Sequence, residues 1–243
     1  GTTGHAAQVF LNQRELDYNA RQGGLLKAVY NVSDKDRILS TFDYGFCLDG
    51  MLAQRWLSYW KVFHVCVGRV DPMEIHRKME SYRFNVVMSG TPWLARFTEV
   101  AEQNGRPYPL KLLIGGGGGG VTDRTRKWIE NFWEAPLCMT YACTEAATVL
   151  GFECLERRGY HINELDFFIE ILEPDSEGYG EVVMTTVHRR VMPLIRYRTR
   201  DVARFIDERC PCGIPLKRLS SLRGRLDEMV ASVWGNVHPD FLE

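Results

Sequence analysis

The chain has 243 residues, of which 45% are hydrophobic and 25% are charged. This composition is ordinary for a globular protein, and the length suits one large domain or two small ones. A formal net charge of −1 gives no electrostatic reason to expect nucleic acid or an anionic membrane as a partner. No apolar run approaches the length of a membrane span.

The first two-thirds of the chain alternates helix and strand patterns. Asp71 and Pro72 are typical of a helix N-terminus, and Glu74 is placed to close a capping box. The patterns predict a helix over 71–82, a strand over 85–88, a helix from 91 that Gly105 ends, a strand over 111–114, a helix over 122–133 and a strand over 137–141. Strands separated by such helices imply right-handed crossovers and a parallel sheet, whose ligands bind at the carboxyl ends of the strands.

After about residue 150 the pattern changes to strands separated only by turns. Strands are predicted over 167–172, 181–186 and 194–198, with a hairpin-type connection over 174–180. The predicted fold class is therefore α/β: a parallel sheet flanked by helices, followed by a smaller antiparallel β-sheet or distorted barrel.

The seven cysteines do not indicate a disulfide scaffold, because an odd number in a chain of this size favours a reducing compartment. We therefore expect a cytoplasmic protein. Four cysteines lie within or beside apolar stretches, which favours small buried hydrophobic side chains: Cys47, Cys66, Cys138 and Cys143.

The other three cysteines predict a zinc knuckle. Cys210 and Cys212 form a Cys-x-Cys-Gly sequence that suits two thiolates on one tetrahedral ion. Cys154 and His161 lie upstream and flank the same antiparallel region, so the four could form a closed structural Cys₃His site. Reduced thiols in a surface loop with a solvated histidine are the alternative.

Two glycine-rich loops suit a phosphate group. Residues 1–4, Gly-Thr-Thr-Gly, offer backbone N–H groups and hydroxyls, although such runs are also common in turns. The six glycines of 115–120 lie between a predicted strand and a capped helix, where close approach to a ligand competes with a linker role.

Three further motifs follow strands or turns. Residues 141–145, Tyr-Ala-Cys-Thr-Glu, offer a ring for a base, a hydroxyl for a phosphate and a carboxylate for Mg²⁺. Residues 197–201, Tyr-Arg-Thr-Arg-Asp, end in a carboxylate that could accept both hydroxyls of a ribose. Residues 223–229 add cations and an acidic turn.

The order and spacing of these motifs resemble the adenylate-forming superfamily of acyl-CoA synthetases, peptide-synthetase adenylation domains and luciferases. That superfamily has a Ser/Thr/Gly loop, Tyr-Gly-x-Thr-Glu, Tyr-Arg-Thr-Gly-Asp and Gly-Arg-x-Asp-Asp, in the order of residues 1–4, 141–145, 197–201 and 224–228 here. Residues 180–186 and 192–199 further resemble the branch of phenylacetate–CoA ligase and coenzyme F390 synthetase. His5 replaces the usual lysine, and Arg200 stands where the general motif has glycine.

The resemblance implies a role for each matching residue. Thr2, Thr3 and Gly4 would cradle the β- and γ-phosphates, and Thr144 would contact the α-phosphate. Gly116 and Gly117 would lie beside the adenine and the acyl group, and Tyr141 would flank the adenine. Glu145 would hold Mg²⁺, Asp201 with Arg225 would bind the ribose, and Asp227 would be a domain hinge. The implied portions are 1–150 for nucleotide and acid, 151–227 for the zinc and ribose motifs, and 228–243 for the hinge and the start of a further domain.

The implied activity is that of an ATP-dependent, AMP-forming acid–thiol ligase with ATP, Mg²⁺, CoA and structural Zn²⁺. Tyr44, Phe46 and Trp93 favour a small aryl acid, although aromatic side chains in such positions are core packing at least as often. The expected partners are a small carboxylic acid and the thiol of CoA or a carrier protein, and a homodimer stays open. An adenylating enzyme that serves a carrier protein or biosynthetic acceptor, and a non-catalytic nucleotide- or acyl-binding remnant, are the alternatives.

Against the family pattern, we expect the chain to be cut short at both ends. The N-terminal part of the fold and the C-terminal domain, whose lysine assists adenylation, would be absent. We therefore expect the chain alone to bind a nucleotide but to turn over slowly or not at all.

Overall fold

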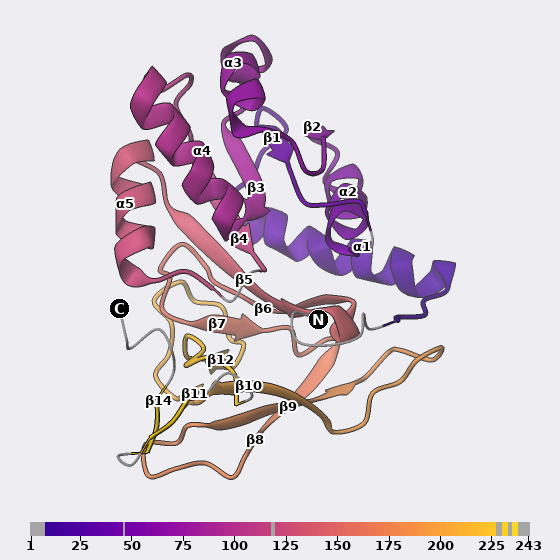
Figure 1. The fold of residues 1–243 in the computed structure, drawn as a ribbon. Helices are drawn as coiled ribbons and strands as arrows, with labels where there is room; N and C mark the ends of the chain where they lie inside the picture. Colours follow the sequence, from indigo (N-terminus) through magenta and orange to yellow (C-terminus); the bar gives the residue numbers. More distant parts are fainter. Residues whose placement is uncertain (1–7, 46, 118–119, 227–229, 233–234, 238–243) are drawn as a thin grey trace. The chain divides into compact units, whose positions relative to one another are not determined.

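The structure, a computed structural model, describes residues 8–45, 47–117, 120–226, 230–232 and 235–237 (Figure 1). The chain divides into two compact units, Gly1–Val149 and Leu150–Glu243. None of the helices in the described part of the chain combines the length and the apolar character that a membrane span requires.

Unit 1 (residues 1–149) contains a five-stranded parallel sheet. Its strands are β1 (Arg37–Ser40), β2 (Phe63–Cys66), β3 (Val86–Gly90), β4 (Leu112–Gly116) and β5 (Leu137–Cys143). They lie in the order β5-β4-β3-β1-β2. The chain moves outward from β1 to β2 and then back to β3, so the order reverses between β1 and β3. This is a topological switch point, where open α/β sheets bind ligands at the carboxyl ends of their strands.

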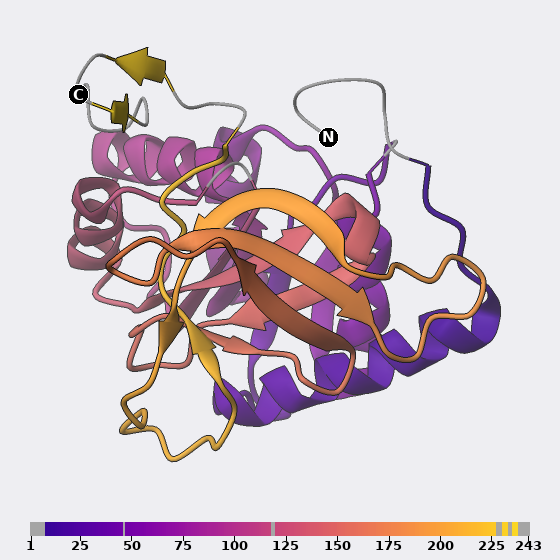
Figure 2. The ribbon, with the colours of Figure 1, turned by 90° about the horizontal axis from the view of Figure 1, so that it is seen from below.

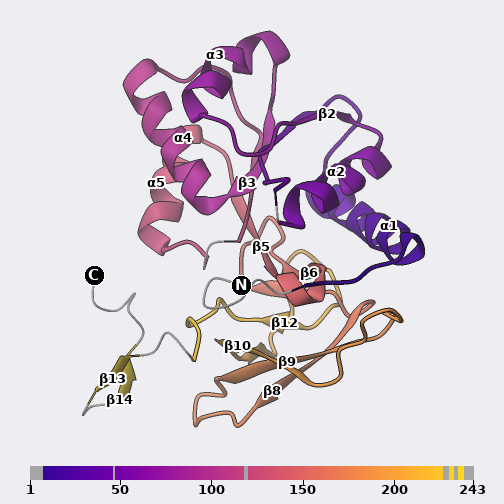
Figure 3. The same ribbon diagram turned by 45° about the vertical axis from the view of Figure 1, so that its right-hand side comes forward.

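Five helices cover the two faces of this sheet. They are α1 (Gln13–Val29), α2 (Asp49–Trp60), α3 (Pro72–Tyr82), α4 (Thr91–Asn104) and α5 (Asp123–Trp133). Figures 1 and 3 show α3, α4 and α5 on one face and α1 with α2 on the other. The parallel sheet flanked by helices is the predicted fold class, which is confirmed for this part of the chain.

Local sequence explains where several helices begin. The side chain of Asn12 accepts from the N–H of Glu15, whose carboxylate accepts from the N–H of Asn12, so α1 begins with a full capping box. The predicted box at α3 is wrong. Asp71 does cap that helix, but Glu74 pairs with Lys78 at 2.7 Å instead of turning back.

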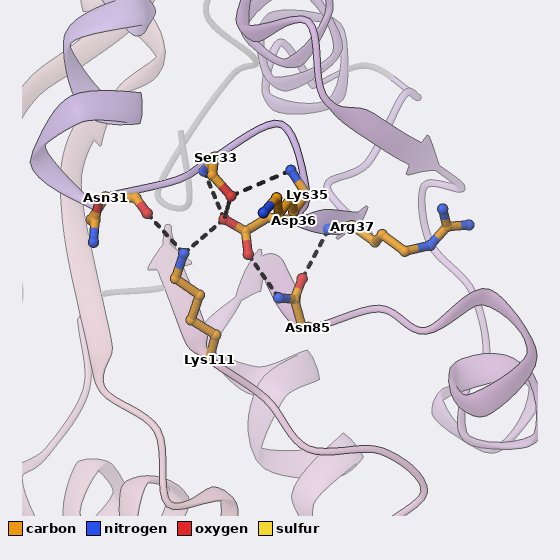
Figure 4. A network of polar contacts seen from close by, with 7 residues as sticks. All are labelled: Asn31, Ser33, Lys35, Asp36, Arg37, Asn85 and Lys111. Atoms are coloured by element: carbon orange, nitrogen blue, oxygen red, sulfur yellow. Dashed lines mark hydrogen bonds and ion pairs between the residues drawn. The ribbon is translucent and has the colours of Figure 1, made fainter.

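A polar network joins the starts of three central strands of unit 1 (Figure 4). The carboxylate of Asp36 accepts from the Ser33 N–H at 2.7 Å, from Lys111 Nζ at 2.7 Å and from Asn85 Nδ2 at 2.8 Å. Asn85 in turn accepts from the Arg37 N–H at 2.8 Å. Burial alone would raise the pKa of Asp36, but these donors and the Lys111 charge outweigh it and lower that pKa.

Unit 2 (residues 150–243) is antiparallel throughout its described strands. One group is β6 (Thr148–Phe152), which begins at the boundary, β7 (Tyr160–Ile162), β12 (Arg218–Leu219) and β11 (Phe205–Ile206), paired in that order. A separate sheet has the order β10-β9-β8, with β8 (Phe167–Leu172), β9 (Gly180–Thr186) and β10 (Tyr197–Ala203). Figure 2 shows these three strands, in orange, as strongly curved. β13 (Val230–Ser232) and β14 (Gly235–Val237) form a hairpin pair.

The predicted strand over 194–198 is wrong in its first half. Arg196 has φ of 50°, which interrupts an extended chain, and β10 begins only at Tyr197. The preceding residues are bonded to hydroxyls at the end of β9 instead. The Leu194 N–H donates to Thr186 Oγ1 at 2.9 Å, and the Arg196 N–H donates to Thr185 Oγ1 at 3.0 Å.

Candidate functional site

Three neighbouring strands of unit 1 place glycines and a threonine side by side at their carboxyl ends. Gly90 of β3 pairs with Gly116 of β4, which pairs with Thr140 of β5. A Cβ atom on Gly116 would lie 2.7 Å from Thr140 Oγ1 and 3.4 Å from the Phe42 ring. Gly116 is therefore required for close packing at this edge, and Gly117 follows with φ of 68°.

The motif that follows β5 is divided between the interior and the surface. Tyr141 is only 4% exposed, so its ring packs inside the protein. Thr144 is exposed and Glu145 is half-buried, and both lie on the short 3₁₀ turn Thr144–Ala146. The structure therefore presents Thr144 and Glu145, but not the ring of Tyr141, at the surface.

Two of the aromatic residues predicted to contact the acid, Tyr44 and Trp93, contact residues 66–70, at the end of β2 and just after it. The Tyr44 ring lies against Gly68, and its hydroxyl is hydrogen-bonded with the Cys66 thiol; burial and this bond raise the pKa of Tyr44. Trp93 donates from Nε1 to the carbonyl of Val70 at 2.8 Å. Residues 66–70 thus hold both rings in place. Trp93 also stacks on Phe97 at 5.0 Å between ring centroids.

Several predicted site residues lie outside the described residues. They are Thr2, Thr3, Gly4, Phe46 and Asp227. Of the four cysteines expected to be buried, Cys138 is buried, but Cys66 and Cys143 are half-buried and Cys47 is exposed. The expectation for Cys47 is wrong because that residue lies in the irregular segment between β1 and α2.

Unit 2 brings together the two residues predicted to hold a ribose. Asp201 and Arg225 form an isolated antiparallel bridge. The Leu226 N–H donates to the Arg200 carbonyl at 2.8 Å, and the Val202 N–H donates to the Gly224 carbonyl at 2.9 Å. Glu181 of β9 pairs with Val202 of β10 and is 3% exposed; the sequence suggested no role for it.

The four predicted zinc ligands converge in unit 2. The ligand atoms of Cys154, His161, Cys210 and Cys212 all lie within 4.8 Å of one another. Cys154 Sγ is 3.6 Å from Cys210 Sγ, and Cys212 Sγ is 3.4 Å from His161 Nε2. A disulfide is excluded at 3.6 Å. Zn–S and Zn–N bonds of ordinary length give tetrahedral edges of about 3.5–3.8 Å, so the four atoms fit a zinc ion.

The local electrostatics favour a neutral histidine beside one acidic thiol. Burial, followed by the Arg218 charge, lowers the pKa of His161. Burial raises the pKa of Cys154 to about 12. Burial also acts to raise the pKa of Cys210, but hydrogen bonds from Cys212 and the Arg218 charge outweigh it and lower that pKa. A bound divalent cation would favour the thiolate form of all three cysteines.

Arg218 links the two halves of this cluster and was missed by sequence reasoning. It is 4% exposed, and its guanidinium donates to the carbonyl of Arg158 at 2.5 Å and to that of Glu208. The first carbonyl lies between Cys154 and His161, and the second lies just before Cys210. An arginine in the sequence does not by itself distinguish a buried clamp from a solvated side chain.

Solved structures identify the class of fold. 2-Hydroxyisobutyryl-CoA ligase in complex with 2-HIB-AMP matches with a TM-score of 0.87, covering 94% of this chain and 52% of that chain at 16% identity. O-succinylbenzoate coenzyme A synthetase from Bacillus subtilis in complex with AMP matches with a TM-score of 0.71, covering 100% of this chain and 51% of that chain at 16% identity. The fold is therefore the acyl-CoA ligase fold.

Sequence comparison finds homologues along the whole chain. Phenylacetate–coenzyme A ligase from Pseudomonas putida is 28% identical over 253 residues, and that from Escherichia coli K12 is 26% identical over 255. Both alignments cover 100% of this chain but only 57% of the relative, so the chain spans just over half the length of these proteins. No protein-family model matches the chain. Along its whole length the chain is homologous to phenylacetate–coenzyme A ligases.

Proposed function

We propose that this protein acts as an AMP-forming acid–CoA ligase on an aryl or other small carboxylic acid. The observation that carries the proposal is the row Gly90, Gly116 and Thr140 at the carboxyl edge of β3, β4 and β5, beside the switch point of the sheet. Its relatives along the full chain are phenylacetate–coenzyme A ligases, which supports CoA as the acceptor over a carrier protein.

Each unit contributes its own contacts to this proposal. In unit 1, Gly116 and Gly117 lie beside the adenine and the acyl group, because a glycine edge permits close approach. Thr144 donates its hydroxyl to the α-phosphate, which its exposure allows. In unit 2, Asp201 accepts from the ribose hydroxyls, and Arg225 supports it across the bridge. Because Tyr141 is only 4% exposed, it can offer adenine no more than a small contact.

The proposed chemistry has two steps. The substrate carboxylate attacks the α-phosphorus of ATP, pyrophosphate leaves, and the thiol of CoA then takes the acyl group and releases AMP. Positioning and charge neutralisation supply most of the catalysis in such a transfer. Glu145 would hold Mg²⁺, which neutralises phosphate charge when bound. Thr144 keeps the α-phosphate in line with the incoming carboxylate.

The zinc ion has a structural role in this proposal. Cys154, His161, Cys210 and Cys212 would hold it in a closed tetrahedral set that leaves no position for substrate. Three ligands precede β7 or follow β11, and the fourth, His161, is part of β7. The ion would therefore tie the strand pair β7–β12 to the loops at its ends.

Exchange of labelled pyrophosphate into ATP tests the adenylation step. The full-length protein that contains this chain is incubated with ATP, Mg²⁺ and a panel of aryl and short aliphatic acids. We expect exchange that depends on the acid, and a loss on the order of 10–100-fold in Glu145→Gln. Glu134→Gln, which removes an exposed carboxylate of unit 1, is the matched control and should change nothing. No acid-dependent exchange across the panel would reject the ligase proposal.

A further inference from the structure

Glu181 is a buried carboxylate that accepts hydrogen bonds from one short stretch of β10. It is 3% exposed and accepts from the Arg198 guanidinium, with Nε at 2.7 Å, and from the Arg200 backbone N–H at 3.0 Å. Burial of a carboxylate is costly unless the charge is paired and hydrogen-bonded. Both conditions are met here, and both are met by residues that immediately precede Asp201.

That stretch of β10 is a bulge. Arg198 pairs with Val183 and Val202 pairs with Glu181, so four steps along β10 face only two steps along β9. Arg200 lies inside the bulge with φ of 69°, in the left-handed region that side chains other than glycine rarely adopt. The general motif of the superfamily has glycine at this position, whereas this chain must hold an arginine there.

Hydrogen bonds from β9 compensate for the unfavourable backbone. The Arg200 N–H, which the bulge removes from the strand ladder, is satisfied by Glu181. Thr199 donates from its hydroxyl to the Val182 carbonyl at 2.8 Å and accepts from the Asp201 N–H at 3.1 Å. Strained backbone persists only where its surroundings over-determine it, and such positions cluster at functional sites.

The bulge determines how Asp201 is presented. The Arg200 carbonyl accepts from the Leu226 N–H at 2.8 Å, so Arg200 is held by β9 on one side and by the segment of Arg225 on the other. Removal of the β9 contact would free the N–H side of this peptide and let Asp201 turn away from the bridge. Because Arg198 neutralises the charge of Glu181, the carboxylate acts through the backbone and adds no charge of its own to a ligand.

We propose that Glu181 is a positioning residue for ribose recognition: it fixes the strained bulge at Arg200 and thereby aims Asp201 at a cis-diol. This inference rests on the proposed function, in which Asp201 binds the ribose hydroxyls. It extends that function by making discrimination for a ribonucleotide depend on a residue that need not touch the nucleotide. Glu181→Ala should therefore weaken ribose selectivity without changing the affinity for the phosphate and base.

The first measurement compares AMP with 2′,3′-dideoxy-AMP by calorimetric titration of the full chain. We expect the wild type to prefer AMP by roughly tenfold, as for hydrogen bonds to a charged group. Glu181→Ala should bring this ratio close to one while binding of the dideoxy nucleotide stays unchanged. Glu170→Ala is the matched control, because it removes an Arg–Glu pair of the same sheet outside the bulge, and its ratio should equal the wild-type ratio. An unchanged ratio in Glu181→Ala overturns the inference.

The second measurement needs no nucleotide. Amide hydrogen exchange of residues 199–202 should become at least about tenfold faster in Glu181→Ala and stay unchanged in Glu170→Ala. If the wild type binds neither nucleotide, the proposed function fails, and the exchange rates still decide whether Glu181 fixes the bulge. Slow exchange in Glu181→Ala overturns the inference. If Glu181→Ala does not fold, Glu181→Gln replaces it, because it keeps one acceptor for the Arg200 N–H and should give exchange rates between those of wild type and those expected for Glu181→Ala. The double variant Glu181→Ala/Arg200→Gly is measured beside it. Exchange rates equal to wild type in both of these variants would also overturn the inference.

Discussion

Each of the two units is stabilised internally by a different balance of interactions. The largest fully buried side chains in the described chain all belong to unit 1: Trp60, Trp133, Tyr30, Phe84, Phe97, Ile38, Leu39, Leu57, Met79, Met88, Leu94 and Leu112. The described core of unit 2 combines Phe152, Tyr160, Phe167 and Met184 with smaller side chains such as Val182 and Val183. Unit 2 adds three buried polar features to this core, namely the Cys₃His cluster, Arg218 and Glu181. We therefore expect unit 1 to depend mainly on hydrophobic burial and unit 2 to depend in addition on its cysteine–histidine cluster and buried charges.

The difference also separates two ways of building a site. In unit 1 the site residues follow from the topology, because parallel strands bring Gly90, Gly116 and Thr140 to one edge. In unit 2 the candidate ribose contact depends on a bulge that side-chain contacts maintain. Function in unit 1 should therefore tolerate surface changes away from its own site residues, and function in unit 2 should respond to single polar substitutions away from the ligand.

Removal of the metal should separate the two units most strongly. A strong chelator, or Cys212→Ser, should destabilise unit 2 by several kcal/mol, because metal binding free energy is folding free energy in small closed sites. Hydrogen exchange followed by mass spectrometry should show faster exchange in peptides from 150–220 and unchanged exchange in peptides from 30–145. Cys47→Ser replaces an exposed cysteine and serves as the control. Less than half an equivalent of zinc in the purified wild type would contradict the zinc assignment.

A core substitution should produce the opposite pattern. Trp133 is 1% exposed, stacks on Phe97 at 5.0 Å between centroids and donates from Nε1 to Thr98 Oγ1 at 2.9 Å. Trp133→Ala should cost about 3–5 kcal/mol through the cavity and leave the buried Thr98 hydroxyl without this donor. Zinc content should stay at the wild-type value. Equal acceleration of exchange in both units would show that they unfold together and would break the comparison.

The sequence predicted the elements with strong local signals and missed those whose signal is tertiary. The helix over 122–133 was predicted because Thr122 and Asp123 are typical of a capped start, and α5 begins there with Thr122 as its N-cap. No helix was predicted over α1, which has a capping box but also contains Gly23 and Gly24, residues that disfavour a helix interior. Gly23 is required by packing: a Cβ there would lie 2.4 Å from the Trp56 ring. No pattern in one segment reveals such a contact.

The candidate sites divide in the same way. The Cys₃His cluster could be predicted, because few residue types ligate zinc and their chemistry is visible in the sequence. The role of Glu181 could not, because it depends on the register shift between β9 and β10. A glutamate beside valines in a strand pattern predicts only a position at a sheet edge or on a solvated sheet face. The bulge moves the Arg200 N–H toward it, and that displacement follows from how two distant segments pair.

The smallest predicted effect tests whether polar contacts matter in unit 1 as well. Asp36→Asn removes the charge that Lys111 and the Ser33 N–H stabilise, and it should cost about 1–2 kcal/mol at pH 7, since Lys111 is partly exposed. The folded pKa of Asp36 lies below its unfolded value, so its contribution is present above about pH 4 and is lost as the pH falls through the folded pKa. Urea unfolding of the wild type and of Asp36→Asn should therefore give a difference in unfolding free energy that shrinks as the pH falls below about 4.

Asp17→Asn is the control: it breaks an exposed pair with Arg55 and should cost about 0.5 kcal/mol or less. A cost for Asp36→Asn no larger than this control would mean that the parallel sheet depends on its apolar core alone, and the contrast between the units would be sharper than we propose.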